Sequence, residues 1–173
     1  MGVNQHRKEA PKNVKCMIVT VSDSRTKATD KSGKLIIDLL KEAGYEVTDY
    51  QITKDEYTSI REMVRGADNR SDIEAIIFNG GTGITLRDTT YEAVSSMLDK
   101  TIPGFGELFR FLSFRDDIGA AAMLSRAVAG VRGKTAVFSI PGSSGAVKLA
   151  TEQLIIPELT HVMREIYKNE ATS

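Results

Sequence analysis

The fold is decided by residues 75–88, which read Ala75-Ile76-Ile77-Phe78-Asn79-Gly80-Gly81-Thr82-Gly83-Ile84-Thr85-Leu86-Arg87-Asp88. The first four residues are apolar, too few for a helix and rich in isoleucine, so they predict a buried strand. A glycine cluster follows at once, and a helical pattern begins at Thr89 or Thr90. Glycines at such a junction let backbone amides approach an anion without Cβ clashes. With Arg87 and Asp88 beside it, the junction predicts a site for a phosphorylated ligand and a metal ion.

Two common nucleotide-binding motifs do not match the chain. A dinucleotide fingerprint beginning at Gly81 needs a third glycine where Leu86 stands. The triplet Gly133-Lys134-Thr135 resembles the end of a phosphate loop, but the required upstream glycine is Val128 and a strand follows. On spacing alone, the glycine cluster at residues 80–83 fits an ordinary tight strand-to-helix turn as well as an anion site.

The composition is that of an ordinary globular domain. The 173 residues are 41% hydrophobic and 27% charged, and 23 Lys plus Arg balance 23 Asp plus Glu. No global charge therefore attracts nucleic acid or an anionic membrane, and no apolar run is long enough to span a bilayer. The single Cys16 lies in an apolar run and is expected to be a buried, inert thiol. A chain with one cysteine and no apolar signal core is expected in the cytoplasm.

Hydrophobic periodicity predicts alternating strands and helices after a loose polar arm at residues 1–13. Ser32 is expected to cap the first helix, which Gly44 ends, and Asp55 to stand before the second helix. An alanine-rich helix is expected over residues 119–131, and the last helix over residues 146–168 is expected to be interrupted at Pro157. The strands are predicted at residues 14–21, 45–52, 75–78 and 135–140.

This alternation predicts an α/β fold: one domain over residues 14–173, with an open, mostly parallel sheet and helices on both faces. Ligands in such folds gather at the carboxyl ends of the strands. Three polar or glycine-rich loops follow strands, at residues 22–31, 80–88 and 141–146. We expect them to converge at one edge of the sheet, where Asp55 also joins them.

Several short blocks occur in a characteristic order along residues 14–160: Thr20-Val21-Ser22-Asp23, Gly80-Gly81-Thr82-Gly83, Asp88-Thr89-Thr90, Glu92-Ala93, Pro103-Gly104-Phe105-Gly106-Glu107, Leu124-Ser125-Arg126-Ala127-Val128-Ala129-Gly130 and Pro141-Gly142-Ser143. In this ordered set the chain resembles the MoaB/Mog family of molybdenum cofactor biosynthesis proteins. The segment at residues 105–114 and the Pro-Gly-Ser turn are closer to the MoaB branch of that family.

The resemblance implies a molybdopterin-binding fold and molybdopterin adenylyltransferase activity. ATP and molybdopterin would become adenylyl-molybdopterin and pyrophosphate with the help of Mg²⁺, before a separate protein inserts molybdenum. The resemblance also implies assembly into trimers or hexamers. The functional aspartates of the family fall at Asp55 and Asp88 of this sequence, where they would be the catalytic residues.

The expected substrates carry many negative charges, and this limits what the two aspartates can do. A bare carboxylate would repel a triphosphate, so Asp55 and Asp88 are interpreted as Mg²⁺ ligands. The glycine cluster would hold phosphates through its amides, with a hydroxyl donated by Thr82. The residues expected to bind the ligand are Ser22, Gly80, Gly81, Thr82, Gly83, Pro141, Gly142 and Ser143.

Other interpretations of the same residues stay open. Asp55 and Asp88 each stand where a carboxylate can cap a helix, and Ser22 and Ser143 are also common turn residues. The chain could carry molybdopterin without adenylylating it. It could instead be a structural partner in cofactor assembly, an interpretation that rests on a phenylalanine-rich segment. That segment is also our predicted subunit contact, and its members are Phe105, Phe109, Phe111 and Phe114.

Overall fold

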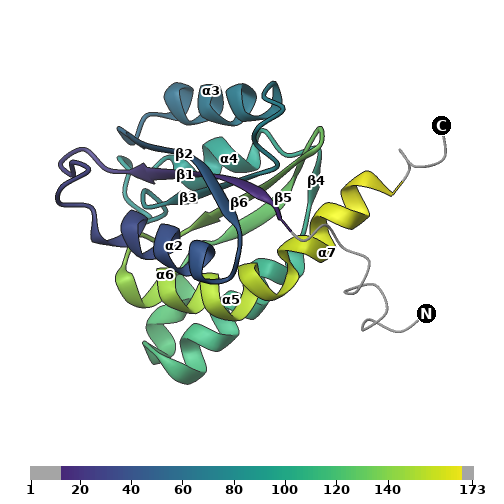
Figure 1. Ribbon diagram of the computed structural model, residues 1–173. Helices are drawn as coiled ribbons and strands as arrows, with labels where there is room; N and C mark the ends of the chain where they lie inside the picture. Colours follow the sequence, from purple (N-terminus) through teal and green to yellow (C-terminus); the bar gives the residue numbers. More distant parts are fainter. Residues whose placement is uncertain (1–12, 169–173) are drawn as a thin grey trace.

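The computed structural model describes residues 13–168, so the predicted arm at residues 1–13 lies almost wholly outside the described residues. Strands and helices alternate along the first half of the chain, and an antiparallel pair of strands interrupts the pattern in the second half (Figure 1). The elements in chain order are β1 Lys15–Val21, α2 Lys31–Glu42, β2 Glu46–Thr53, α3 Tyr57–Asp68, β3 Ala75–Asn79, α4 Thr90–Ser95, β4 Lys100–Thr101, α5 Pro103–Asp116, the 3₁₀ helix η1 Gly119–Leu124, β5 Val128–Arg132, β6 Thr135–Ile140, α6 Ser144–Ala150, the π-helical turn η2 Thr151–Ile155 and α7 Ile156–Tyr167.

The strands form one mixed sheet in the order β2-β1-β3-β6-β5-β4. The first four strands are parallel, so their carboxyl ends lie at one edge of the sheet. The last two run antiparallel to their neighbours, because β5 and β6 form a hairpin and β4 pairs with β5. The prediction of an open, mostly parallel sheet is confirmed.

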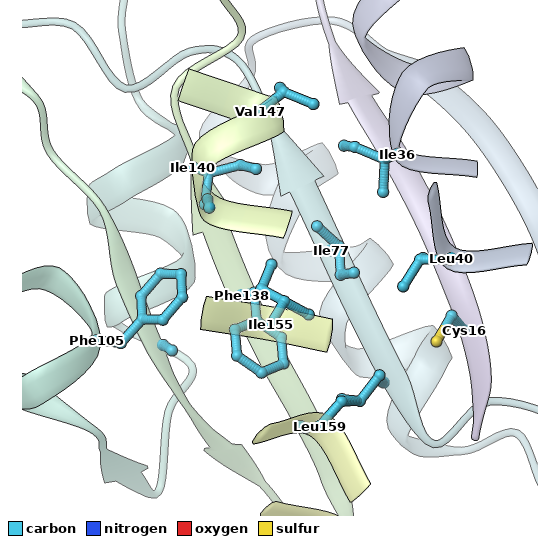
Figure 2. Close-up of a cluster of buried hydrophobic side chains, with 14 of the residues drawn as sticks. Cys16, Ile36, Leu40, Ile77, Phe105, Phe138, Ile140, Val147, Ile155 and Leu159 are labelled. Carbon is cyan, nitrogen blue, oxygen red and sulfur yellow. The ribbon is translucent and has the colours of Figure 1, made fainter. Parts of the chain in front are cut away.

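Side chains alternate between two apolar cores, one on each face of the sheet. Along β3, Ala75 and Ile77 pack into the core covered by α2, α5, α6 and α7, while Ile76 and Phe78 pack into the core covered by α3 and α4. Figure 2 shows the first of these cores, where Ile36 and Leu40 of α2, Val147 of α6 and Leu159 of α7 meet the strands. Burial on both faces explains why these strands are nearly continuous apolar runs rather than half-polar ones.

Cys16 is fully buried within the same core. Burial raises the pKa of its thiol to about 12, with a smaller contribution from the charge of Glu74. The prediction of an inert thiol is consistent with this environment, since the thiolate is the reactive form.

The phenylalanine-rich segment divides between the two sides of α5. Phe105 and Phe109 are buried in the core, so these two are not available for the predicted subunit contact. Phe111 and Phe114 are 56% and 60% exposed and lie on the outer side of the helix.

Two predictions about helices are wrong. The N-cap of α2 is Asp30, whose carboxylate accepts from the amide of Gly33, and the predicted cap Ser32 is already inside the helix. The predicted helix at residues 119–131 is instead η1 followed by β5. Residues 128–132 extend because they pair with β6, and this pairing outweighs the helix propensity of the alanines.

The lengths and breaks of the helices bear on two further predictions. The last helical segment is interrupted as predicted, but before Pro157 rather than at it: the π-helical turn η2 ends at Ile155, and Pro157 lies in the first turn of α7. Proline has no N–H to donate to the preceding turn, so a regular helix cannot continue unchanged into this position. In residues 13–168, no helix combines the length and the apolar character needed to cross a membrane.

Candidate functional site

The loops after β1, β3 and β6 meet at the carboxyl edge of the sheet, as predicted. The amide of Gly80 donates to the carbonyl of Ile140 (3.0 Å), and Arg25 Nη2 approaches the carbonyl of Gly142 (3.5 Å). The chain leads from β1 outward to β2 and from β3 outward to β6, so the strand order reverses between β1 and β3. Such switch points are where ligands bind in open α/β sheets.

A pocket of about 280 Å³ opens where these loops meet. Six of its eight lining residues are among the predicted site residues. The two additions are Leu124, the last residue of η1, and Ser125, which follows it. A larger hollow of about 400 Å³ lies between β2 and α3, away from the glycine loop. The lining residues of the loop pocket are Gly81, Thr82, Gly83, Asp88, Leu124, Ser125, Pro141 and Gly142.

The backbone of the glycine loop is oriented by hydrogen bonds to its carbonyls. The carbonyl of Gly81 accepts from the amide of Thr90 (3.0 Å), and those of Thr82 and Gly83 accept from Arg126 (3.0 and 2.5 Å). In a planar trans peptide the carbonyl and the following N–H point in opposite directions. In the described part of the chain, the three amides that follow these carbonyls have no protein acceptor. The loop therefore presents a row of unpaired donors, as an anion site requires.

Gly81 stands where only glycine fits. Its φ is +67°, and an added Cβ would lie 2.1 Å from Thr90 Oγ1 and 2.5 Å from Asp55 Oδ2. Gly80 has a φ of +102°, and an added Cβ there would lie 2.4 Å from the carbonyl oxygen of Val21. The glycine cluster is thus required both for its backbone conformation and for close packing against β1 and the buried aspartate.

Asp55 lies beneath the glycine loop and is 7% exposed. Its Oδ1 accepts from the amide and hydroxyl of Thr89 (3.0 and 2.8 Å), at the N-terminus of α4. The interpretation of Asp55 as the cap of its own helix is wrong, because α3 begins after Glu56 with no side-chain cap. Asp55 instead connects the end of β2 to the loop that follows β3.

Asp88 lines the pocket, and its Oδ2 accepts from the amide and hydroxyl of Thr85 (3.0 and 2.6 Å). It does not cap α4, whose N-cap is Thr89, so the capping interpretation is wrong here as well. Gly83 lies directly against this carboxylate: a Cβ added there would be 2.5 Å from Asp88 Oδ2. In the described residues, Asp88 Oδ1 and Asp55 Oδ2 have no hydrogen-bond partner, so one oxygen of each carboxylate is unpaired.

An exposed ion pair joins the first and second loops. Arg87 donates to Asp23 Oδ2 (2.6 Å), and Asp23 Oδ1 accepts from the amide of Asp55 (3.2 Å). The hydrogen bond from Arg87 is the main reason that the pKa of Asp23 lies below its usual value. Because both side chains are exposed, the pair contributes little to stability.

The two predicted serines have local partners. Ser22 Oγ accepts from the amide of Arg25 (3.1 Å), and Ser143 Oγ accepts from the amide of Ala146 (3.3 Å) at the start of α6. Neither serine lines the pocket. Their roles in ligand binding stay predictions.

A buried polar network, which was not predicted from the sequence, supports the site from below. The side chain of Asp30 is fully buried and accepts from Thr20 Oγ1 and from the hydroxyl of Tyr50, each at 2.5 Å. Thr20 also accepts from Asn79 (2.9 Å), at the end of β3, so the network spans three strands. Asp30 further contacts Arg25, the residue that reaches Gly142.

A scan against known families matches residues 17–161 to a family described as a probable molybdopterin binding domain. The chain belongs to this family. Two relatives named molybdenum cofactor biosynthesis protein B each match 98% of the chain. The protein of Halalkalibacterium halodurans is 65% identical, and the match covers 99% of its length. The protein of Bacillus subtilis is 54% identical, and the match covers its full length. The predicted membership of the MoaB branch is confirmed.

Solved structures of the molybdopterin-binding family have the same fold. A crystal structure of a molybdenum cofactor biosynthesis protein B is 56% identical, with a TM-score of 0.90 over 92% of this chain and 99% of that one. The tungsten cofactor synthesizing protein MoaB of Pyrococcus furiosus is 39% identical, with a TM-score of 0.81 over 91% of this chain and 99% of that one.

In this molybdopterin-binding domain, replacing Asp30 with asparagine is expected to lower the free energy of unfolding at neutral pH by roughly 1–3 kcal/mol. Burial raises the pKa of Asp30, but the hydrogen bonds, led by those from Thr20 and Tyr50, outweigh burial and hold the pKa below its usual value. A lowered pKa stabilises the fold above the unfolded-state value and loses that effect as the pH falls through the folded-state value. The difference between wild type and variant should therefore shrink in acid.

The measurement is urea unfolding of both proteins at neutral pH and at a series of lower pH values, extending below the ordinary pKa of an aspartate, about 3.9. The matched control is Asp38→Asn, an exposed carboxylate of the same helix, which should change stability by less than about 0.5 kcal/mol. An equal difference for Asp30→Asn at both pH values would argue against a charged, hydrogen-bonded Asp30.

Proposed function

We propose that the chain acts in molybdenum cofactor biosynthesis by adenylylating molybdopterin with ATP and Mg²⁺, releasing adenylyl-molybdopterin and pyrophosphate. The observation that carries the proposal is the row of unpaired amides in the glycine loop beside Asp88, in a pocket at the switch point of the sheet. Membership of a molybdopterin-binding family supports the pterin as one ligand. The names of the relatives support cofactor biosynthesis as the pathway.

The chemistry asks mainly for positioning. An oxygen of the terminal phosphate of molybdopterin attacks the α-phosphorus of ATP, and the bond from that phosphorus to the bridging oxygen breaks. Pyrophosphate leaves with the electron pair of that bond. A phosphate monoester has a second pKa of about 6 and is mostly dianionic at neutral pH, so no strong general base is required. The obstacle is the approach of two polyanions, which amide donors and cations overcome.

The residues present fit a magnesium ion held mainly by the substrates. Residues 13–168 contain no cluster of three or more His, Cys, Asp or Glu side chains that could hold a metal alone. Magnesium commonly binds through one or two carboxylates together with phosphate oxygens and water. Asp88 Oδ1 and Asp55 Oδ2 are the oxygens that would hold it. When bound, the ion would neutralise charge on the phosphates.

The two aspartates have unequal access to such an ion. Asp88 lines the pocket, while Asp55 lies under Gly81 and is mostly buried. We therefore propose Asp88 as the main ligand. Asp55 would hold the loop through Thr89 as well as contribute its second oxygen.

The test is turnover of the purified protein with molybdopterin, ATP and Mg²⁺, following pyrophosphate release and adenylyl-molybdopterin together. The expected result is equal amounts of the two products, formed only when all three components are present. Tight binding of molybdopterin without product would contradict the adenylyltransferase and support a carrier instead.

We also propose that the chain assembles into trimers or hexamers through the outer side of α5 and the adjoining η1. This surface carries an unusual number of exposed large apolar side chains, which is typical of interaction sites. Light scattering should give a mass of at least three chains, and a monomer would contradict the assignment. The exposed residues are Leu108, Phe111, Phe114, Ile118, Met123 and Leu124.

A further inference from the structure

Arg126 lies between η1 and β5 and reaches across to the glycine loop, more than forty residues earlier in the sequence. Its Nε donates to the carbonyl of Thr82 (3.0 Å), and its Nη2 donates to the carbonyl of Gly83 (2.5 Å). One guanidinium thus binds two consecutive carbonyls of the loop that we propose holds phosphates.

The guanidinium is itself held on its other side by α4. Its two terminal nitrogens donate to the carboxylate of Glu92, and its centre lies 4.8 Å from the centroid of the Tyr91 ring. The side chain of Arg126 is only 25% exposed. The hydrogen bond from Arg126 is the main reason that the pKa of Glu92 is lowered, as expected for a persistent pair near neutral pH.

Holding these two carbonyls has a consequence for the ligand side of the loop. A carbonyl oxygen turned toward a phosphate would repel it, whereas an amide would bind it. Because each peptide is planar, fixing the oxygens of Thr82 and Gly83 against Arg126 directs the next two amides to the opposite side.

We propose that Arg126 is a positioning residue, which keeps the amides of the glycine loop directed toward a phosphate group of the substrates. This inference rests on the proposed function. Its contacts are with the loop backbone, Glu92 and Tyr91, so it acts through the loop rather than on the reacting atoms. Lysine cannot replace it, because an ammonium lacks the planar fork that serves two carbonyls and a carboxylate at once.

The experiment compares wild type, Arg126→Lys and Glu92→Gln by calorimetric titration with Mg-ATP and with inorganic pyrophosphate, and by steady-state kinetics. The matched control is Arg132→Lys on the neighbouring strand, where a 35% exposed arginine pairs with Asp99 and lies outside the pocket. Thermal unfolding of all four proteins monitors folding.

Arg126→Lys is expected to raise the Kd of at least one probe, and the KM for ATP, by about tenfold or more while the number of binding sites stays the same. Glu92→Gln should shift both in the same direction but less, and Arg132→Lys should leave them unchanged. If Arg126 served only to keep the protein folded, Arg126→Lys would lower the number of binding sites per chain and the apparent kcat, and Kd and KM would stay as they were.

That result, or unchanged affinities in both Arg126→Lys and Glu92→Gln, would overturn the inference while the proposed function stands. Failure of the wild-type chain to bind either probe would overturn both.

Discussion

Replacing Asp88 with asparagine is expected to lower kcat by about a hundredfold, the scale for removing a group that stabilises developing charge. The carbonyl oxygen of asparagine can still accept from Thr85, so the loop geometry should survive and the charge alone is lost. The affinity for molybdopterin should change much less than turnover, since an Mg²⁺ ligand matters mainly for bringing the two polyanions together. The measurement is pyrophosphate release at saturating substrates, together with a binding isotherm for molybdopterin.

The control for this variant is Asp72→Asn. Asp72 is an exposed carboxylate paired with Arg70 just before β3, at the opposite end of that strand from the pocket. Its variant should turn over like wild type. Equal turnover in wild type and Asp88→Asn would contradict the assignment of Asp88, and an equal loss in both aspartate variants would indicate a general effect of lost charge.

Replacing Gly81 with alanine is expected to be the most damaging small substitution in the loop. A residue with a side chain is strained at a φ of +67°, and the new Cβ would lie 2.1 Å from Thr90 Oγ1 and 2.5 Å from Asp55 Oδ2. Strain of this kind costs roughly 1–3 kcal/mol, and relief requires the loop to move away from Asp55. The free energy of unfolding should therefore fall by that amount, and binding of Mg-ATP should be lost.

Gly66→Ala is the matched control, because Gly66 lies in α3 with nothing within 4 Å of an added Cβ. Alanine favours a helix over glycine by up to about 1 kcal/mol, so this variant should be as stable as wild type or more stable. Urea unfolding and calorimetric titration measure both variants. A Gly81→Ala protein with wild-type stability and affinity would show that the tight packing under the loop does not matter.

The strands and the edge that holds the site were predictable because they depend on local patterns. Apolar runs of four to eight residues that end in glycine or polar loops can be identified without knowledge of distant contacts. The failure at residues 119–131 has the opposite cause. Alanine favours a helix locally, but residues 128–132 gain more by pairing with β6 in a hairpin, and such pairing is invisible in a single segment.

The candidate site was predictable to a similar extent. The glycine loop, Asp88 and the Pro141-Gly142 turn follow strand ends, so one rule about α/β sheets was enough to bring them together. Asp30 and Arg126 were missed as parts of the site, because their importance lies in partners far along the sequence, such as Tyr50 and Thr82. A buried acid or a loop-binding arginine has no distinctive local pattern.

The most direct test of the account uses ATP labelled with ³²P at the α-phosphate, incubated with molybdopterin, Mg²⁺ and the wild-type protein. The account predicts that the label moves to molybdopterin in a one-to-one ratio with unlabelled pyrophosphate, and that Asp88→Asn nearly abolishes the transfer. Label that remains in ATP while molybdopterin is bound would contradict it, and the glycine loop would then belong to a carrier rather than an enzyme.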